Sequence, residues 1–172
     1  AACERAVVFG NTWQLLARAG QFPHDGCFVT TEVAGEPILL VRDQGIVRAL
    51  SNVCRHKATV LEGDPEGSRK IFCCRYHRWT YDLSGRLHRA PEFEGVEEFD
   101  PQGVCLPRFH AAVWGPLVGV HLAANPSSLW AVRDPLTSEV PVMSALSFAE
   151  RRSYDIACNW KVFVENYLDG GY

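Results

Sequence analysis

Four side chains of metal-binding type stand in two short clusters of this sequence. The first cluster is Cys54-Arg55-His56 and the second is Cys74-Arg75-Tyr76-His77, which together give the pattern C-x-H-x17-C-x2-H. Thiolates and neutral imidazoles are ligands of both zinc and iron. Each cluster follows a run of strand-forming residues, so we expect two loop tips that converge on one site. The spacing therefore predicts a metal centre with two sulfur and two nitrogen ligands.

Two kinds of centre use this ligand set. In a structural zinc site all four side chains surround one ion. In a Rieske [2Fe-2S] centre the two Cys hold one iron and the two His hold the other. Zinc sites usually pair ligands of one type, whereas each cluster here mixes Cys with His. The mixing favours the two-iron cluster, because each loop then supplies one ligand to each iron. A zinc site and unconnected thiols and imidazoles remain the alternatives.

Cations surround the predicted ligands. The oxidised two-iron centre with two thiolates is formally neutral, and one electron makes it negative. Cations near the centre would favour the reduced form and could attract an acidic electron donor; the alternative interpretation is that they are solvated loop charges. The four residues concerned are Arg55, Lys57, Arg75 and Arg78.

The loops need strands to position them. Short runs rich in β-branched residues, bounded by turn residues, predict consecutive antiparallel strands. Residues 12–19 fit a helix or a strand equally well. The segment 91–107, which has five acidic residues and three prolines, predicts a long solvated surface loop. We expect strands over residues 28–33, 37–41, 46–50, 70–73, 79–82 and 113–122.

The end of the chain has a different pattern. Prolines punctuate residues 126–141 as in a linker, and from Asn159 the sequence predicts a capped helix with one apolar stripe. We therefore expect two parts, residues 1–125 and residues 126–172. The stripe consists of Trp160, Phe163, Val164, Tyr167 and Leu168.

Composition excludes several classes of function. The chain has 172 residues and a formal net charge of −3, which argues against a nucleic-acid partner. Its longest largely apolar run covers residues 111–124, shorter than the roughly 20 residues of a membrane helix, so we expect no membrane segment. Seven cysteines form no even disulfide framework, and they read as thiols and ligands of a cytoplasmic protein.

The motifs resemble a known family. Asn52-Val53-Cys54-Arg55-His56 and the run from Cys74 to Leu87 are similar to the Rieske domain of ring-hydroxylating oxygenase α subunits. The resemblance implies a mainly β fold of antiparallel sheets with a small cluster-binding subdomain, followed by the truncated α+β start of a catalytic domain. It also implies a [2Fe-2S] cluster on Cys54, His56, Cys74 and His77.

A second resemblance lies near the other end. Asn159-Trp160-Lys161 and Glu165-Asn166-Tyr167-Leu168-Asp169-Gly170-Gly171-Tyr172 are similar to the start of that family's catalytic domain, and most similar to choline-type and other quaternary-ammonium monooxygenases. There a His after the final Tyr is the first mononuclear iron ligand. The resemblance implies that Asp169 bridges the two metal sites across a subunit boundary; the alternative is a helix-terminal Asp.

For the complete protein the resemblance implies a Rieske-type mono- or dioxygenase. Electrons would pass from a reductase or ferredoxin through the cluster to a mononuclear Fe(II), for O2-dependent hydroxylation or demethylation of a small organic substrate. The assembly would be a homotrimer or α3β3, and the 172 residues alone would oxidise nothing. The rival interpretation is a free-standing Rieske ferredoxin, which does not need the residues after Asn125.

The sequence departs from the family at three loop positions. Arg75 and Arg78 stand where the family usually has Pro and Gly, and Ala58 stands where a Gly is common, so the loop shape is an open question. Thr59 and Tyr76 occupy the positions of the bracing disulfide in respiratory Rieske proteins. Without that disulfide we expect a potential in the lower part of the roughly −150 to +300 mV Rieske range.

The remaining candidates receive structural interpretations. Cys73 should point away from its neighbour Cys74 in a strand and be a small buried residue. Trp79 should pack over the cluster. Structural or surface roles are expected for His24, His88, His110 and His121.

Overall fold

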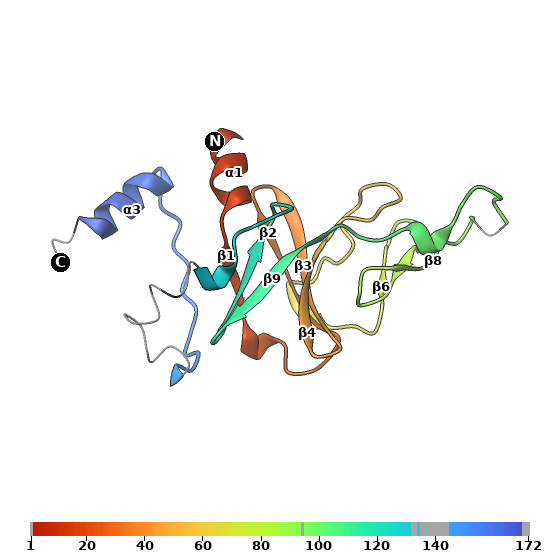
Figure 1. The fold of residues 1–172 in the computed structure, drawn as a ribbon, viewed down its shortest axis with the longest axis horizontal. Helices are drawn as coiled ribbons and strands as arrows, with labels where there is room; N and C mark the ends of the chain where they lie inside the picture. Colours follow the sequence, from red (N-terminus) through yellow and green to blue (C-terminus); the bar gives the residue numbers. More distant parts are fainter. Residues whose placement is uncertain (1, 94, 132–133, 135–144, 170–172) are drawn as a thin grey trace.

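The computed structural model describes residues 2–93, 95–131, 134 and 145–169, and Figure 1 shows a mainly β structure. Two antiparallel sheets contain all the strands of the described residues. The large sheet has the order β1-β10-β9-β4-β3-β2-β5 and the small sheet has the order β6-β7-β8. The mainly β architecture predicted from the sequence is confirmed.

Seven short strands form the large sheet: β1 (Gln14–Arg18), β2 (Cys27–Val33), β3 (Glu36–Asp43), β4 (Ile46–Ser51), β5 (Glu66–Ser68), β9 (Arg108–Trp114) and β10 (Leu117–His121). The small sheet consists of β6 (Phe72–Cys73), β7 (Thr80–Tyr81) and β8 (Leu87–Arg89). The helices are α1 (Ala2–Val7), α3 (Trp160–Leu168) and the short 3-10 helices η1 (Phe9–Asn11), η2 (Ala19–Gln21) and η3 (Pro101–Gly103). No helix of the described residues is long and apolar enough to cross a membrane.

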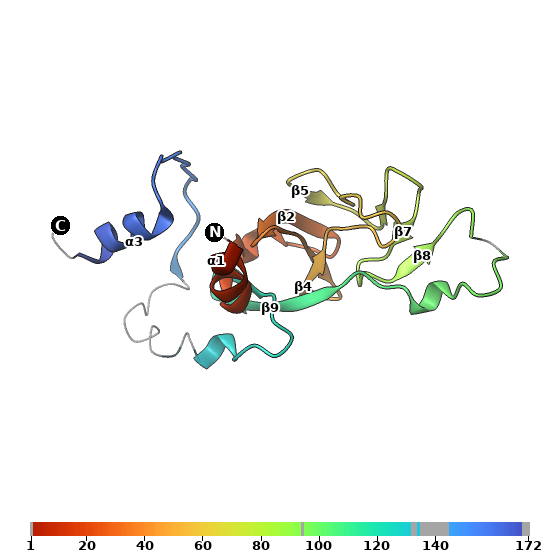
Figure 2. The same cartoon turned by 90° about the horizontal axis from the view of Figure 1, so that it is seen from above.

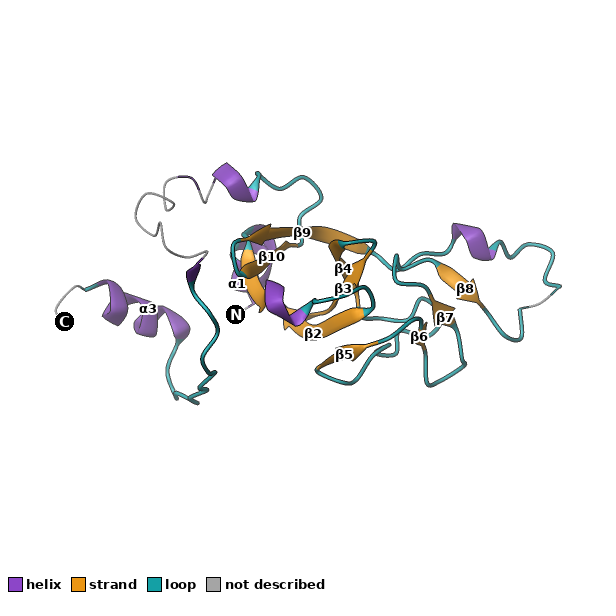
Figure 3. Cartoon of the chain, turned by 90° about the horizontal axis from the view of Figure 1, so that it is seen from below, coloured by secondary structure: helices purple, strands orange, loops and turns teal. Residues whose placement is uncertain are grey.

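The large sheet is curled, as Figure 3 shows from below, and it is buried on both faces at its centre. Ile38 and Leu40 of β3 pack inside the curl with Val118 and Val120 of β10. Leu39 and Val41 of the same strand face the opposite side, towards the small sheet. Burial on both faces explains why β3 is an uninterrupted apolar run rather than an alternating one.

The small sheet is an excursion from the large one. Between β4 and β9 the chain contributes only the short edge strand β5 to the large sheet, and it rejoins that sheet in β9, which pairs with β4 through Ala49↔Phe109 and Leu50↔Arg108. The segment between them contains both Cys/His clusters, and Figures 1 and 2 show most of it as a separate lobe at one end of the molecule. The lobe is fastened by a shared core that includes Phe28 and Leu50 of the large sheet and Phe72 and Tyr81 of the small one.

Three sequence expectations about strands need correction or a decision. Residues 113–122, expected as one strand, are parts of two: Gly115 has a φ of 53°, which allows the tight turn that separates β9 from β10. The ambiguous residues 12–19 contain strand β1, which pairs with β10. Residues 70–73 contribute only the two residues of β6.

Cys73 was predicted to be buried, and this is wrong. The side chain does point away from Cys74, as expected for a strand, but it is exposed whereas Cys74 is buried. The reason is that β6 is an edge strand of the small sheet, which covers the core with one face only.

The helix predicted after Asn159 is present as α3. The Asn159 side chain accepts a hydrogen bond from the Lys161 N–H at 3.1 Å, which is the expected cap. The helix contacts the N-terminal segment, through an edge-to-face pair of Trp160 with Phe9 and an ion pair of Lys161 with Glu4. The division into residues 1–125 and 126–172 stays a prediction; residues 132–133, 135–144 and 170–172 lie outside the described part.

Candidate metal centre

The two Cys/His clusters form loops with the same backbone geometry. In the first loop the Cys54 N–H donates to the Thr59 carbonyl at 2.8 Å, and the Ala58 N–H donates to the Cys54 carbonyl at 3.0 Å. In the second loop the Cys74 N–H donates to the Trp79 carbonyl at 2.8 Å, and the Arg78 N–H donates to the Cys74 carbonyl at 3.0 Å. Each Cys therefore begins a closed turn that ends five residues later.

Both turns contain a residue in the left-handed conformation. The φ of Ala58 is 53° and that of Arg78 is 59°, at the two positions where the resembled family has Gly. The loop shape is thus kept although neither residue is Gly. A side chain at such a φ costs roughly 1–2 kcal/mol relative to a right-handed backbone, so both loops store strain next to the ligands.

The base of each loop is fixed. Asn52 closes the first loop, because its amide donates to the Glu62 carbonyl at 2.8 Å and its side-chain oxygen accepts from the Glu62 N–H at 2.9 Å. The buried Glu62 carboxylate is paired with Arg69 at 2.9 Å. The second loop joins β6 to β7 and is closed by the pair Cys73↔Thr80. The lobe thus presents both loops on short, anchored stems.

The thiols point inward. Cys54 and Cys74 are each only 2% exposed, and burial raises the pKa of Cys54, an effect to which the neighbouring Cys74 thiol adds. The Tyr81 oxygen lies 3.3 Å from the Cys54 sulfur and accepts the Arg55 N–H at 3.0 Å. Burial also raises the pKa of Tyr81, so its proton stays available for donation to a thiolate. The Cys54 thiol needs a positive partner to be ionised here.

The two imidazoles lie together. The rings of His56 and His77 are 4.5 Å apart, and His56 stacks on Trp79 at 4.8 Å with an angle of 7° between the planes. The predicted packing of Trp79 at the site is confirmed. Burial lowers the pKa of His56, and the neighbouring His77 lowers it further. The neutral imidazole that a metal requires is therefore the favoured form of His56.

One orphan atom tests whether these residues fit a metal cluster. The Nδ1 atom of His56 is buried and has no hydrogen-bond partner, and an unsatisfied buried nitrogen is costly unless something binds it. Among the described residues no three His, Cys, Asp or Glu side chains gather as they would around one metal ion. A [2Fe-2S] cluster requires only a thiolate pair at one iron and an imidazole pair at the other. The four residues fit that group, which when bound accepts and releases one electron.

Sequence reasoning missed part of the surroundings of His56. Residues 91–107 were expected to be a solvated loop, and the acidic residues that the structure describes there are exposed, but Phe93 and Phe99 turn inward. Phe93 meets the edge of His56 at 5.6 Å and of Trp79 at 5.3 Å, and Phe99 packs on Trp79 at 5.6 Å. Two aromatic residues within a run of carboxylates were the available signal. The segment covers His56.

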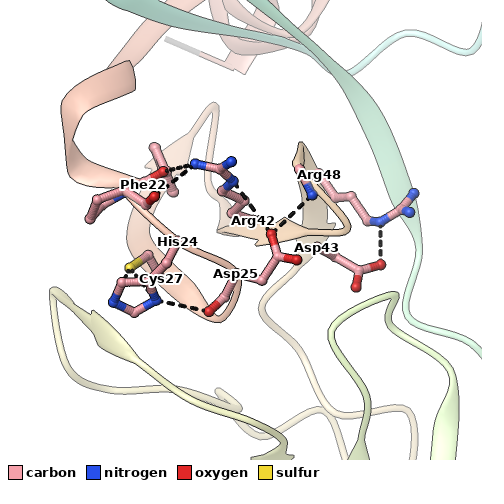
Figure 4. Close-up of polar contacts among 9 residues, drawn as sticks. Phe22, His24, Asp25, Cys27, Arg42, Asp43 and Arg48 are labelled. Carbon is pink, nitrogen blue, oxygen red and sulfur yellow. Dashed lines mark hydrogen bonds and ion pairs between the residues drawn. The ribbon is translucent and has the colours of Figure 1, made fainter.

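Another Cys and His pair lies on the large sheet, and Figure 4 shows its surroundings. The Cys27 sulfur is 3.5 Å from both ring nitrogens of His24, so it sits against the ring rather than in its plane. The nearby Asp25 carboxylate accepts the Gly45 N–H and pairs with Arg42. These contacts fasten residues 22–26 to the β3–β4 hairpin, which agrees with the structural role predicted for His24.

Asp169 lies far from the ligand loops of its own chain. It caps the end of α3, where its N–H donates to the Glu165 carbonyl at 3.0 Å, and its side chain is exposed. Figures 1 and 2 show α3 and the small sheet at opposite ends of the described chain. The structure brings the His56 and His77 rings together and places the Cys54 and Cys74 thiols beside each other, and it does not bring Asp169 to these residues.

Known proteins show the same features. The profile of the Rieske [2Fe-2S] domain matches residues 12–100. Chloroplastic choline monooxygenase of Arabidopsis thaliana is 37% identical over 96% of this chain and 42% of its own length. The carnitine monooxygenase oxygenase subunit of Escherichia coli strain K12 is 29% identical over 96% of this chain and 46% of its own.

A solved structure gives the same result. The apo form of the quaternary ammonium Rieske monooxygenase CntA has a TM-score of 0.85 and 26% identity, over 96% of this chain and 50% of that one. The chain spans half or less of the length of these three proteins. The chain therefore belongs to the Rieske [2Fe-2S] domain family, because the family profile matches residues 12–100 and the two Cys/His loops fit its cluster.

Proposed function

We propose that this chain is the electron-transferring Rieske portion of an oxygenase α subunit. The observation that carries the proposal is the extent of the similarity. The Rieske profile ends at residue 100, whereas the choline and carnitine monooxygenase similarities cover 96% of the chain. A ferredoxin that only carries electrons would account for the cluster loops but not for a monooxygenase-like segment that includes α3.

The proposed activity of the whole protein is O2-dependent oxidation of a quaternary ammonium compound. The proteins that support this substrate class are named for choline, for carnitine and for quaternary ammonium compounds. In such a protein Cys54, His56, Cys74 and His77 hold the cluster, and a mononuclear Fe(II) site in the remaining sequence reacts with O2. The chain's own residues bury the two Cys side chains, favour the neutral form of His56 and cover that ring.

The proposed partners are a reductase or ferredoxin as electron donor and further copies of the subunit, as a homotrimer or α3β3 assembly. Asp169 is proposed to bridge the cluster of one copy to the iron site of another. Its distance from the ligand loops of its own chain, seen in Figure 1, is what a bridge between subunits needs. A cytoplasmic location is part of the proposal, and the seven free cysteines support it.

The test uses the 172-residue chain after reconstitution with iron and sulfide. With NADH and a reductase, the cluster absorbance should bleach while choline or carnitine causes no additional O2 uptake and no product. Product formation coupled to O2 uptake by this chain alone would contradict the proposal that this chain only transfers electrons. A chain that binds zinc and cannot be reduced would contradict the electron-transfer role itself.

A further inference from the structure

The two ligand loops are positively charged in a chain that is negative as a whole. Residues 54–59 and 74–79 contain four Lys and Arg and no Asp or Glu, whereas the complete chain has a formal net charge of −3. Four acidic residues lie elsewhere in residues 54–90, and they already have partners. Glu62 and Asp64 pair with Arg69, Glu66 accepts from the Gln21 amide, and Asp82 accepts from backbone N–H groups of its own turn.

The cations of the two ligand loops have no such partners. Their side chains are exposed and make no hydrogen bond or ion pair with the described residues. The carboxylate that acts on the site is Glu92, whose effect on His56 is smaller than those of His77 and Lys57. The two loops therefore carry four cations and no carboxylate of their own beside the imidazoles. The cations are Arg55, Lys57, Arg75 and Arg78.

The second loop adds an exposed aromatic ring to these charges. Tyr76 is 64% exposed, and its ring lies on His77 with a centroid distance of 3.8 Å. Arg75 precedes it and Arg78 follows His77, so a guanidinium stands on each side of the pair in sequence. Arg78 has a φ of 59°, a conformation that Gly adopts freely and Arg only with strain. Among the described residues, no hydrogen bond or ion pair of the Arg78 side chain offsets that strain.

We propose that Arg75, Tyr76 and Arg78 form a docking surface for an acidic protein electron donor. The inference rests on the proposed function and specifies the partner of that site. Carboxylates of the donor pair with the two guanidiniums, and Tyr76 places the donor against His77. One electron then leaves the donor, which is oxidised, and reduces the cluster, with no bond broken.

The charges favour a protein donor over other occupants. Complementary charge raises the rate of encounter between proteins by about 10-fold or more, and this enhancement falls as the salt concentration rises. An exposed aromatic ring flanked by arginines is typical of the centre of a protein interface. The opposing possibility is a second copy of the chain, whose α3 carries Glu165 and Asp169, and the experiment separates the two.

The experiment measures how fast two reductants reduce the reconstituted chain in a stopped-flow instrument. One reductant is a reduced acidic plant-type [2Fe-2S] ferredoxin, and the other is the methyl viologen radical cation, which needs no basic surface. Arg75→Gln and Arg78→Gly are compared with the wild type at roughly 20 mM and 500 mM salt. The matched control is Arg86→Gln, an exposed cation of the turn between β7 and β8 that lies outside the ligand loops.

At low salt each loop variant should lower the ratio of the ferredoxin to the viologen rate constant by roughly threefold or more, and weaken its salt dependence. Arg78→Gly should do so while raising the unfolding temperature, since it removes strain. Arg86→Gln should leave the ratio unchanged.

Three results would overturn the proposal: an unchanged ratio for both loop variants, an equal fall for Arg86→Gln, or a change in oligomeric state of the loop variants in sedimentation, which would assign the surface to a second copy. A chain that neither reductant reduces would instead contradict the proposed electron-transfer function.

Discussion

Among single residues, we expect Tyr81 to influence how readily a cluster on Cys54 is reduced. The Tyr81 hydroxyl lies 3.3 Å from the Cys54 sulfur and is held there by the Arg55 N–H. Hydrogen bonds to cluster sulfurs stabilise the additional negative charge of the reduced state. Sequence alone did not single out Tyr81, because nothing in its spacing shows that a strand residue of the second loop reaches the Cys of the first.

Tyr81→Phe should therefore lower the midpoint potential. Loss of one hydrogen bond of about 1 kcal/mol corresponds to about 40 mV for a one-electron couple. The measurement is a redox titration followed by visible absorbance. The control is Tyr76→Phe, because loss of this exposed hydroxyl should leave the potential unchanged within error. Phe28→Tyr would not serve as a control, since it buries a new hydroxyl. Equal potentials for wild type and Tyr81→Phe would refute the role of this hydrogen bond.

Replacement of a strained loop residue by Gly should raise the free energy of unfolding, whereas replacement by Gly usually lowers it. Ala58→Gly relieves a left-handed φ of 53°, and the gain of roughly 1–2 kcal/mol exceeds the roughly 0.4–1 kcal/mol lost through unfolded-state entropy. The apo chain should gain about 0.5–1 kcal/mol in chemical denaturation. Ala124→Gly, at an exposed position without a positive φ, should instead lose stability. If both variants lose stability, the loop is not strained.

At the scale of elements, the strands and the cover segment were predictable to different extents. Runs of β-branched residues bounded by turn residues located β2, β3 and β4 closely, because their register is set by neighbours in sequence. The turn that divides β9 from β10 was missed although Gly115 and Pro116 signal it, since a long apolar run outweighed them. The packing of Phe93 and Phe99 could not be predicted, because their partners Trp79 and His56 are remote in sequence.

The cover segment should contribute to stability through its aromatic residues only. Phe99→Ala removes a half-buried ring from Trp79 and Phe93 and should cost about 1–3 kcal/mol. Val96→Ala, in the same segment at a side chain that is 48% exposed, should cost little. Thermal unfolding measures the loss of stability, and the rate at which a chelator bleaches the cluster measures the loss of cover over His56. Similar losses for both variants would show that the segment is merely solvated.

A buried histidine in β10 makes folding sensitive to acid. His121 is 3% exposed, its Nδ1 accepts the Ala123 N–H at 3.1 Å, and burial lowers its pKa, with His110 in the opposite strand adding to the effect. The unfolded chain therefore binds the proton more tightly than the folded chain. The stability that neutral His121 contributes is fully present above the pKa of the unfolded chain, about 6.5, and is lost as the pH drops below that value.

The sign can be checked with one variant. The free energy of unfolding, measured in urea between about pH 7.5 and 5, should decline more steeply for the wild type than for His121→Asn, which cannot be protonated. The difference between the two proteins removes the contributions of the other titrating groups. Parallel curves would show that His121 does not control the acid response.

At the scale of the whole molecule, chemistry is concentrated at one end and the monooxygenase-like helix stands at the other. The four candidate cluster ligands could be predicted from the sequence, since two short motifs contain them all. The position of Asp169 was not, because it depends on how α3 lies relative to the sheets, and Figure 1 shows the two ends far apart. A bridge through Asp169 must therefore join two copies.

Binding of the [2Fe-2S] cluster by the four loop residues is the central claim, and EPR of the dithionite-reduced protein tests it most directly. The account predicts two irons and two sulfides per chain and a mean g value below that of the free electron. It also predicts nitrogen hyperfine couplings from two histidines, with those of one histidine lost in His56→Cys and of the other in His77→Cys. A colourless protein with one bound zinc, or a spectrum without nitrogen couplings, would contradict it.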